Sequence, residues 1–135
     1  MHPKFDKAEK LSREAIGAGI EVHRLIGPGL IESVYEKCFV HELDLRGISF
    51  HKQSDVPIVY KGIVFSETLR FDVLLEDLVL IELKAAQEVL PIHKAKLLSY
   101  MKLLKVPLGL IMNFHQPRLV DGISRMILPG TDPSQ

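Results

Sequence analysis

The sequence predicts an α/β fold in which a mixed sheet of four or five strands is flanked by helices. The first observation behind this is the order of hydrophobic patterns: two helical segments, three strand-like runs, a third helix and a buried run. The second is the strand–helix–strand arrangement over residues 78–114. Such a crossover places its two strands parallel in one sheet, so the sheet is expected to be mixed.

Three segments have the apolar periodicity of helices. The first covers residues 8–26 and ends at a Gly-Pro-Gly sequence. The second covers about residues 30–46 and stops at Gly47. The third extends from Pro91 to about residue 104. Its expected apolar face consists of Ile92, Ala95, Leu98 and Met101, with Leu97 and Leu104 left open as further members.

Four apolar segments are expected to be strands: residues 49–60, 63–75, 78–85 and 108–114. Pro57 leaves open a break in the first of them. Residues 119–128 fit either an edge strand or a short helix. Together these elements predict a single domain over residues 1–128, and residues 129–135 are expected to be a disordered tail.

The composition is that of a globular protein with one core. Of 135 residues, 47% are hydrophobic and 25% are charged. Acidic and basic residues balance at 17 each, so overall charge does not indicate a polyanionic partner. The single cysteine, Cys38, excludes an internal disulfide and fits the cytoplasm. No apolar run reaches the roughly 18–20 residues of a membrane span, so no membrane association is expected.

Charged residues interrupt the two apolar strands within residues 69–84. Asp72 lies in the first strand, and Glu82 and Lys84 lie in the second, two residues apart and thus on one face. Charges in such runs are costly unless they are paired, bound to a metal ion or placed at an open end of the sheet. An ordinary ion pair and a metal site therefore both fit this pattern.

The turn between these strands decides whether the two acids meet. A two-residue turn at Glu76 and Asp77 would place Asp72 opposite Ile81. A three-residue loop or a bulge would place it opposite Glu82, with Cβ atoms about 4.5–5.5 Å apart. Carboxylates this close repel by roughly 3 kcal/mol at an effective dielectric constant near 20. A divalent cation between the two carboxylates would reverse that repulsion, so the metal-site interpretation predicts the odd loop or bulge.

Asp72, the run Glu82-Leu83-Lys84 and an upstream helical glutamate, in this order of elements, resemble the PD-(D/E)XK nuclease superfamily. Residues 29–35, Gly-Leu-Ile-Glu-Ser-Val-Tyr, fit the GxxExxY motif of a small bacterial family within it. His23, the Gly-Pro-Gly sequence and Ile-Met-Asn-Phe at residues 111–114 are also similar to that family. The likeness spans roughly residues 10–128.

The resemblance implies a restriction-endonuclease-like core that hydrolyses phosphodiester bonds in DNA or RNA with Mg²⁺ or Mn²⁺. Asp72 and Glu82 would be metal ligands together with the carbonyl oxygen of Leu83. Glu32 would be the helical acid that completes both the metal site and the catalytic set. Lys84 would orient or help deprotonate the attacking water and stabilise charge on the phosphate.

The helix after Lys84 is expected to contact the nucleic acid. Many relatives carry Gln-x-x-x-Tyr there, whereas this chain retains Tyr100 and has Lys96 in place of the glutamine. Residues 89–120 contain no Asp or Glu but five Lys and Arg residues, which suit salt-dependent phosphate contacts. With the tyrosine of the GxxExxY motif, the expected substrate contacts are Tyr35, Lys94, Lys96 and Tyr100.

An alternative interpretation is a non-catalytic module that retained the nuclease fold and binds nucleic acid or a protein. The complete set of catalytic residues favours the enzyme. The small size and Lys96 in place of glutamine favour the module. A homodimer is left open for both, because one domain of this size offers little surface to span a duplex.

Overall fold

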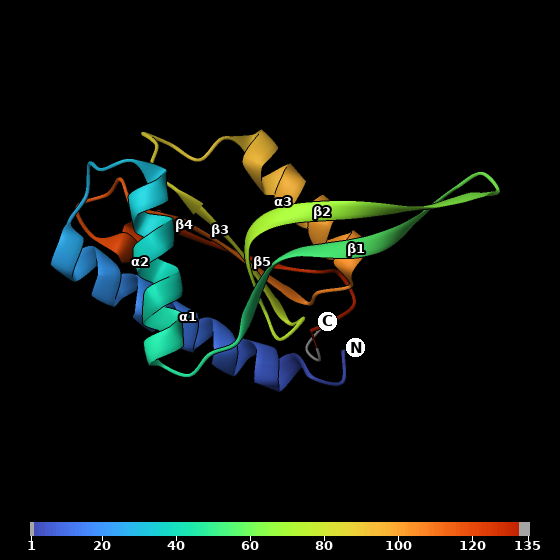
Figure 1. Cartoon of the computed structure of the whole chain (residues 1–135), viewed down its shortest axis with the longest axis horizontal. Coiled ribbons are helices and arrows are strands. Elements are labelled where there is room, and N and C mark those ends of the chain that lie inside the picture. Colours follow the sequence, from blue (N-terminus) through green and yellow to red (C-terminus); the bar gives the residue numbers. More distant parts are fainter. Residues whose placement is uncertain (1, 133–135) are drawn as a thin grey trace.

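A computed structural model describes residues 2–132 as one sheet covered by helices on both faces (Figure 1). The elements in chain order are α1 (Phe5–Ile26), α2 (Glu32–Leu45), β1 (Phe50–Tyr60), β2 (Ile63–Leu75), β3 (Val79–Lys84), α3 (Pro91–Leu104), β4 (Leu108–Asn113), a 3₁₀ turn (Leu119–Gly122) and β5 (Ile123–Ile127). The strand order is β1-β2-β3-β4-β5. Only β3 and β4 pair in parallel among these strands, across the crossover through α3. The predicted mixed sheet is confirmed.

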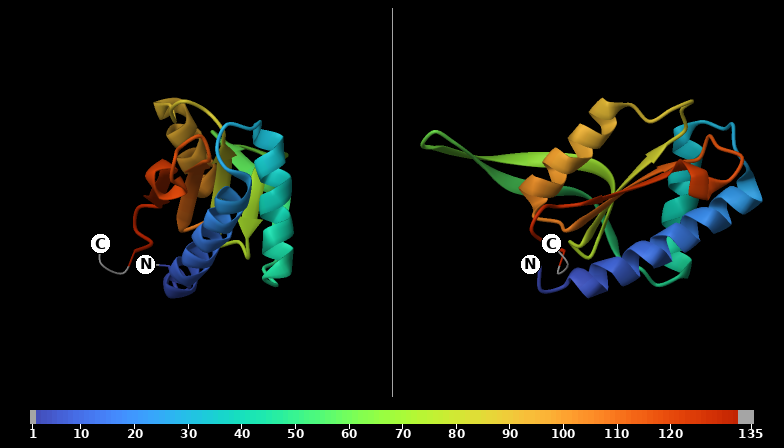
Figure 2. Two further views of the ribbon diagram at one scale, coloured as in Figure 1. Left: turned by 90° about the vertical axis from the view of Figure 1, so that its left-hand side faces the viewer. Right: turned by 180° about the vertical axis from the view of Figure 1, so that it is seen from behind.

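The two faces of the sheet bury two separate cores. Figure 2 shows the helices on the two sides of the sheet. The side chains of β3 that pack with α1 and α2 are those of Val79, Ile81 and Leu83. Leu80 packs instead with α3 on the other face. Because side chains alternate along a strand, Glu82 and Lys84 lie on the face of Leu80. The charged residues of β3 are therefore on the α3 side of the sheet.

Helix α3 has the predicted bounds, but only part of its predicted apolar face is buried. Leu97 and Met101 are its buried residues, whereas Ile92 and Ala95 from the predicted apolar face are exposed. A side chain at Gly109 of β4 would come within 2.6 Å of the Met101 sulfur, so the helix packs directly on this glycine. The close approach of α3 to Gly109 sets the rotation of the helix about its axis. The hydrophobic periodicity of the helix alone does not predict this rotation.

Beyond the body of the sheet, β1 and β2 continue as a two-stranded arm that projects from the molecule (Figure 1). Pro57 does not break β1, since its register with β2 is regular from Gln53 to Tyr60. A proline is tolerated there because β1 is an edge strand, which needs hydrogen bonds on one side only.

Several boundaries differ from the predicted ones. Helix α1 begins earlier, at the buried Phe5. Helix α2 begins at Glu32, two residues later than predicted. Leu30 lies in the loop before the helix, because its main-chain N donates to the hydroxyl of Tyr35. Residues 129–132 form a turn in which the main-chain N of Thr131 donates to a carbonyl. The rest of the predicted tail, residues 133–135, lies outside the described residues.

Candidate functional site

The loop between β2 and β3 has three residues, as predicted. Leu75 pairs with Val79, so residues 76–78 form the loop. This register, continued one position beyond the last pair of the ladder, brings Asp72 opposite Glu82. The two acids therefore come from facing positions on neighbouring strands.

A bulge in β2 aims Asp72 at β3. The pairing of β1 with β2 is interrupted at Lys52, opposite which β2 has three residues, 71–73. A bulge disrupts the ladder and redirects a side chain. Asp72 is its middle residue, and its Oδ2 accepts a hydrogen bond from the main-chain N of Leu83 at 2.7 Å. Asp72 is thus joined to the strand that carries Glu82.

The carboxylate of Glu82 is nearly buried, with 14% of the side chain exposed. Its Oε1 lies 3.6 Å from the Nζ of Lys84 and 3.8 Å from the Nζ of Lys96. Its Oε2 is buried and has no hydrogen-bond partner among residues 2–132. Leaving a buried charged acceptor unpaired costs about 1–3 kcal/mol or more, so this atom is suited to accept a ligand.

A cavity of about 200 Å³ lies beside the two acids, between β2, β3 and α3. Besides Asp72 and Glu82, its polar rim includes Arg70, Lys96 and Tyr100. The ammonium group of Lys96 lies 5.4 Å from the centre of the Tyr100 ring, in a cation–π contact. Two of the predicted substrate contacts therefore line this cavity with the acids.

Burial raises the pKa of Asp72 from its usual 3.8 to about 6. The amide of Leu83 opposes this rise, because its hydrogen bond stabilises the carboxylate. The negative charges of Glu36, Glu32 and Glu82 raise the pKa further, in that order. The raised pKa thus reflects mainly the loss of water around Asp72, with smaller contributions from the nearby acids.

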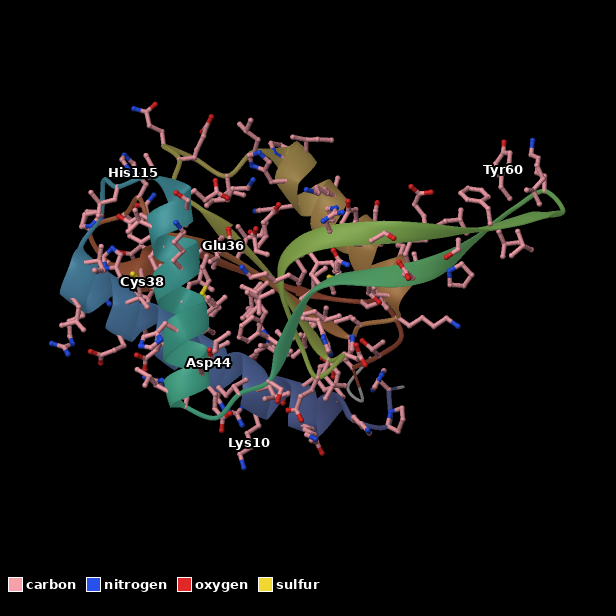
Figure 3. The ribbon with its side chains drawn as sticks, viewed as in Figure 1. Lys10, Glu36, Cys38, Asp44, Tyr60 and His115 are labelled. Carbon is pink, nitrogen blue, oxygen red and sulfur yellow. The ribbon has the colours of Figure 1, made fainter. Side chains whose placement is uncertain are left out.

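Glu36 is a site residue that the sequence analysis missed. Its Oε1 lies 3.2 Å from the Nζ of Lys52, the residue opposite the bulge. Figure 3 shows it on the side of α2 that faces the strands. Glu32, one turn earlier, is exposed and does not line the cavity, although its charge reaches Asp72. The signal in the sequence was the spacing of four residues between Glu32 and Glu36, which places both on one face of the helix.

No group of three or more His, Cys, Asp or Glu side chains among residues 2–132 is close enough to hold a metal ion. The acids that the structure brings together are the pair Asp72 and Glu82. An ion bound between them would have these two carboxylates of the chain as ligands. Glu32 is exposed and does not line the cavity beside them.

The structure does not bring Tyr35 into the cavity. Tyr35 is fully buried and stacks on Phe114, with ring centroids 4.5 Å apart. Its hydroxyl donates to the carbonyl oxygen of Gly27 at 2.6 Å and accepts from the main-chain N of Leu30 at 3.0 Å. Its described contacts thus fasten the loop between α1 and α2.

Two other polar residues shape the chain around Lys84. The buried Asn113 accepts from the main-chain N of Ala86 at 3.1 Å and donates to its carbonyl oxygen at 2.8 Å. This fixes the chain two residues after Lys84. His93 accepts from the main-chain N of Leu90 and so caps α3. Lys94, a predicted substrate contact, is exposed and does not line the cavity.

Comparison with protein families gives a match over residues 9–126 to the PD-(D/E)XK nuclease superfamily. The chain belongs to this superfamily. Searches of curated proteins and of solved structures give no significant match. The matched range runs from α1 into β5 and contains Asp72, Glu82 and Lys84. Nucleases of this superfamily act on nucleic acids and generally use divalent metal ions.

No helix among residues 2–132 of this PD-(D/E)XK domain is long and apolar enough to cross a membrane. The match is to the superfamily as a whole, so the assignment to the GxxExxY family stays a prediction based on residues 29–35.

We expect Tyr35→Phe to lower the free energy of unfolding by about 1–2 kcal/mol, because Gly27 and Leu30 each lose a hydrogen-bond partner. Chemical denaturation measures this. Nucleic-acid affinity per folded molecule should stay unchanged. A loss of affinity at full stability would show instead that Tyr35 contacts the substrate.

We also expect the metal-free protein to lose stability as the pH rises from about 4 to about 6. The pKa of Asp72 is raised in the folded state, so the folded protein binds more protons than the unfolded chain in this window. Asp72→Asn should remove this contribution and stabilise the metal-free protein at pH 7 by roughly 1–2 kcal/mol, allowing for partial exposure. Urea unfolding of both proteins with a chelator, between pH 4 and pH 8, measures the difference. A difference that does not vary with pH would contradict this assignment.

Proposed function

We propose that this domain is a metal-dependent nuclease that hydrolyses phosphodiester bonds in DNA or RNA. The observation that carries the proposal is the unpaired, buried Oε2 of Glu82 beside Asp72 and two lysines. Superfamily membership supports the same reaction class. The GxxExxY motif supports placing the chain in that branch of the superfamily.

The residues present fit a Mg²⁺ or Mn²⁺ ion. Asp72, Glu82 and the carbonyl oxygen of Leu83 are hard oxygen donors on neighbouring strands, and Mg²⁺ is usually held by one or two carboxylates plus waters. A cation would partner the free oxygen of Glu82 and offset the charges that raise the pKa of Asp72. When bound, such an ion supplies an activated water and neutralises charge that develops on the phosphate.

The lysines give the site its other charges. Lys84 and Lys96 both lie near Oε1 of Glu82, which leaves Oε2 for a cation. The ammonium group of Lys84 is a compact donor that would orient the attacking water and bind a phosphate oxygen. Its strand position is fixed by parallel pairing with Asn113. Asp72, with its raised pKa, would take up or release a proton near neutral pH.

Lys96 and Tyr100 would form the substrate side of the cavity. The cation–π contact holds the ammonium group of Lys96 at the rim, where relatives have a glutamine. Arg70 adds a second cation from β2. These groups suit a phosphate next to the one that is cleaved, which would make binding strongly salt-dependent.

In thermal melts, Mn²⁺ should raise the melting temperature of the parent protein. Metal bound only by the folded state stabilises it by about 2.7 kcal/mol at a hundredfold excess over the dissociation constant. The effect should weaken below about pH 6, where a proton competes at Asp72. In Asp72→Asn most of the rise should vanish, since a neutral amide is a poor ligand. An equal rise in both proteins would place the ion elsewhere.

Purified protein with Mn²⁺ should cleave single- or double-stranded DNA or RNA, and Lys84→Ala should lose cleavage while it keeps most of the Mn²⁺-induced stabilisation. Gel assays with labelled substrates measure this, with Lys102→Ala as the control because Lys102 is an exposed α3 lysine that does not line the cavity. Cleavage by Lys84→Ala at the parental rate would exclude the assigned role. Tight nucleic-acid binding without cleavage by the parent would favour the non-catalytic module.

A further inference from the structure

The arm formed by residues 54–69 has one continuous face of paired side chains. The register of β1 with β2 is regular here, and directly opposed residues share a face. The opposed pairs on this face are Ser54 with Leu69, Val56 with Glu67, Ile58 with Phe65, and Tyr60 with Ile63. We call this set the apolar face of the arm.

The apolar face is covered at the root of the arm and uncovered toward its tip. Val56 and Leu69 are only 5% and 8% exposed, where α3 contacts β1. Farther out, Phe65 is 46% exposed, and Tyr60 and Ile63 are each 60% exposed. Figures 1 and 3 show the arm clear of the body, with Tyr60 near its end. A two-stranded ribbon is marginally stable alone, so an exposed apolar face of this kind indicates a partner.

Charge argues against nucleic acid or a lipid surface as that partner. The arm carries two carboxylates, Asp55 and Glu67, and a single cation, Lys61. Binding to phosphate backbones and to anionic membranes depends on several Lys or Arg side chains. The arm therefore suits a protein surface that is apolar and has a balanced charge.

We propose that the apolar face of the arm binds the same face of a second copy of this chain, in an antiparallel two-fold dimer. An isologous contact requires a self-complementary surface, and Ile58, Tyr60, Ile63 and Phe65 bring no like charges together. A two-fold axis midway between the row of Ile58 with Phe65 and the row of Tyr60 with Ile63 would set Tyr60 against the partner's Ile58. This proposal is independent of nuclease activity.

The antiparallel arrangement also pairs the charges of the arm. The ammonium group of Lys61 lies 5.4 Å from the centre of the Tyr60 ring, so it sits at the end of the apolar face. In the dimer the turn at the tip of one arm lies over the middle of the other arm, which brings Lys61 toward the partner's Glu67. The two-fold axis produces this contact twice.

The size and shape of the arm fit a dimer whose interface is formed by side chains and not by added strands. Four apolar tip residues in each arm that bury on the order of 100 Å² each would give about 800 Å² in all, the size of a weak, transient interface. Pro57 lacks an N–H on the edge strand and so disfavours open-ended strand addition. The contact is therefore made by the face of the arm.

Sedimentation equilibrium of the full chain tests the proposal. The parent protein should be in monomer–dimer equilibrium at tens to hundreds of micromolar, and Phe65→Glu should raise its dissociation constant roughly a hundredfold, because each dimer loses two anchors. Val64→Glu is the matched control: Val64 adjoins Phe65, is 67% exposed and points to the opposite face. This control should leave the dissociation constant nearly unchanged. Circular dichroism should show that both variants fold.

A charge exchange tests the antiparallel geometry separately. Lys61→Glu and Glu67→Lys should each weaken the dimer, and the double variant should restore it. A parent protein that stays monomeric at the highest concentration, or one whose dimer is equally sensitive to Val64→Glu, would overturn the proposal. Sedimentation with phosphatidylserine vesicles that is abolished by Phe65→Glu would overturn it in favour of a lipid surface.

Discussion

The burial of Asp72 opposite a second carboxylate, Glu82, is the constraint on which the candidate site depends. Two strands hold carboxylates at facing positions, α2 adds more negative charge, and burial removes the water that would screen it. The lysines near Glu82 neutralise one of its oxygens and leave the other unpaired. Such an arrangement costs stability in the metal-free protein, and a bound cation would recover that cost.

The architecture around the site makes this charge arrangement tolerable. The parallel pair β3 and β4 is buried under helices on both faces, so the end of β3 is rigid where its charges begin. Asn113 fastens the chain that follows, and Tyr35 fastens the loop before α2. The motif tyrosine thus acts on the position of the helix that carries Glu32 and Glu36, at a distance from the cavity itself.

The element order and the parallel crossover followed from the sequence, because the hydrophobic period is a local property of the chain. The odd loop before β3 followed from the interpretation that Asp72 and Glu82 share a metal ion. The rotation of α3 did not follow from the sequence, since it depends on the close approach at Gly109, which only the folded pair brings together. The role of Glu36 also escaped prediction, because it depends on the bulge opposite Lys52. Glu32 remains a predicted ligand that the described structure leaves exposed.

The bulge at residues 71–73 has a mechanical consequence. It lies where the pairing of β2 with β3 ends and β2 continues toward the arm, so Asp72 is close to the point where the arm joins the sheet. A displacement of the arm would act on this short segment, whereas Glu82 on β3 is held by the pairing of β3 with β4. A change in the angle between the arm and the sheet would therefore change the spacing of the two carboxylates.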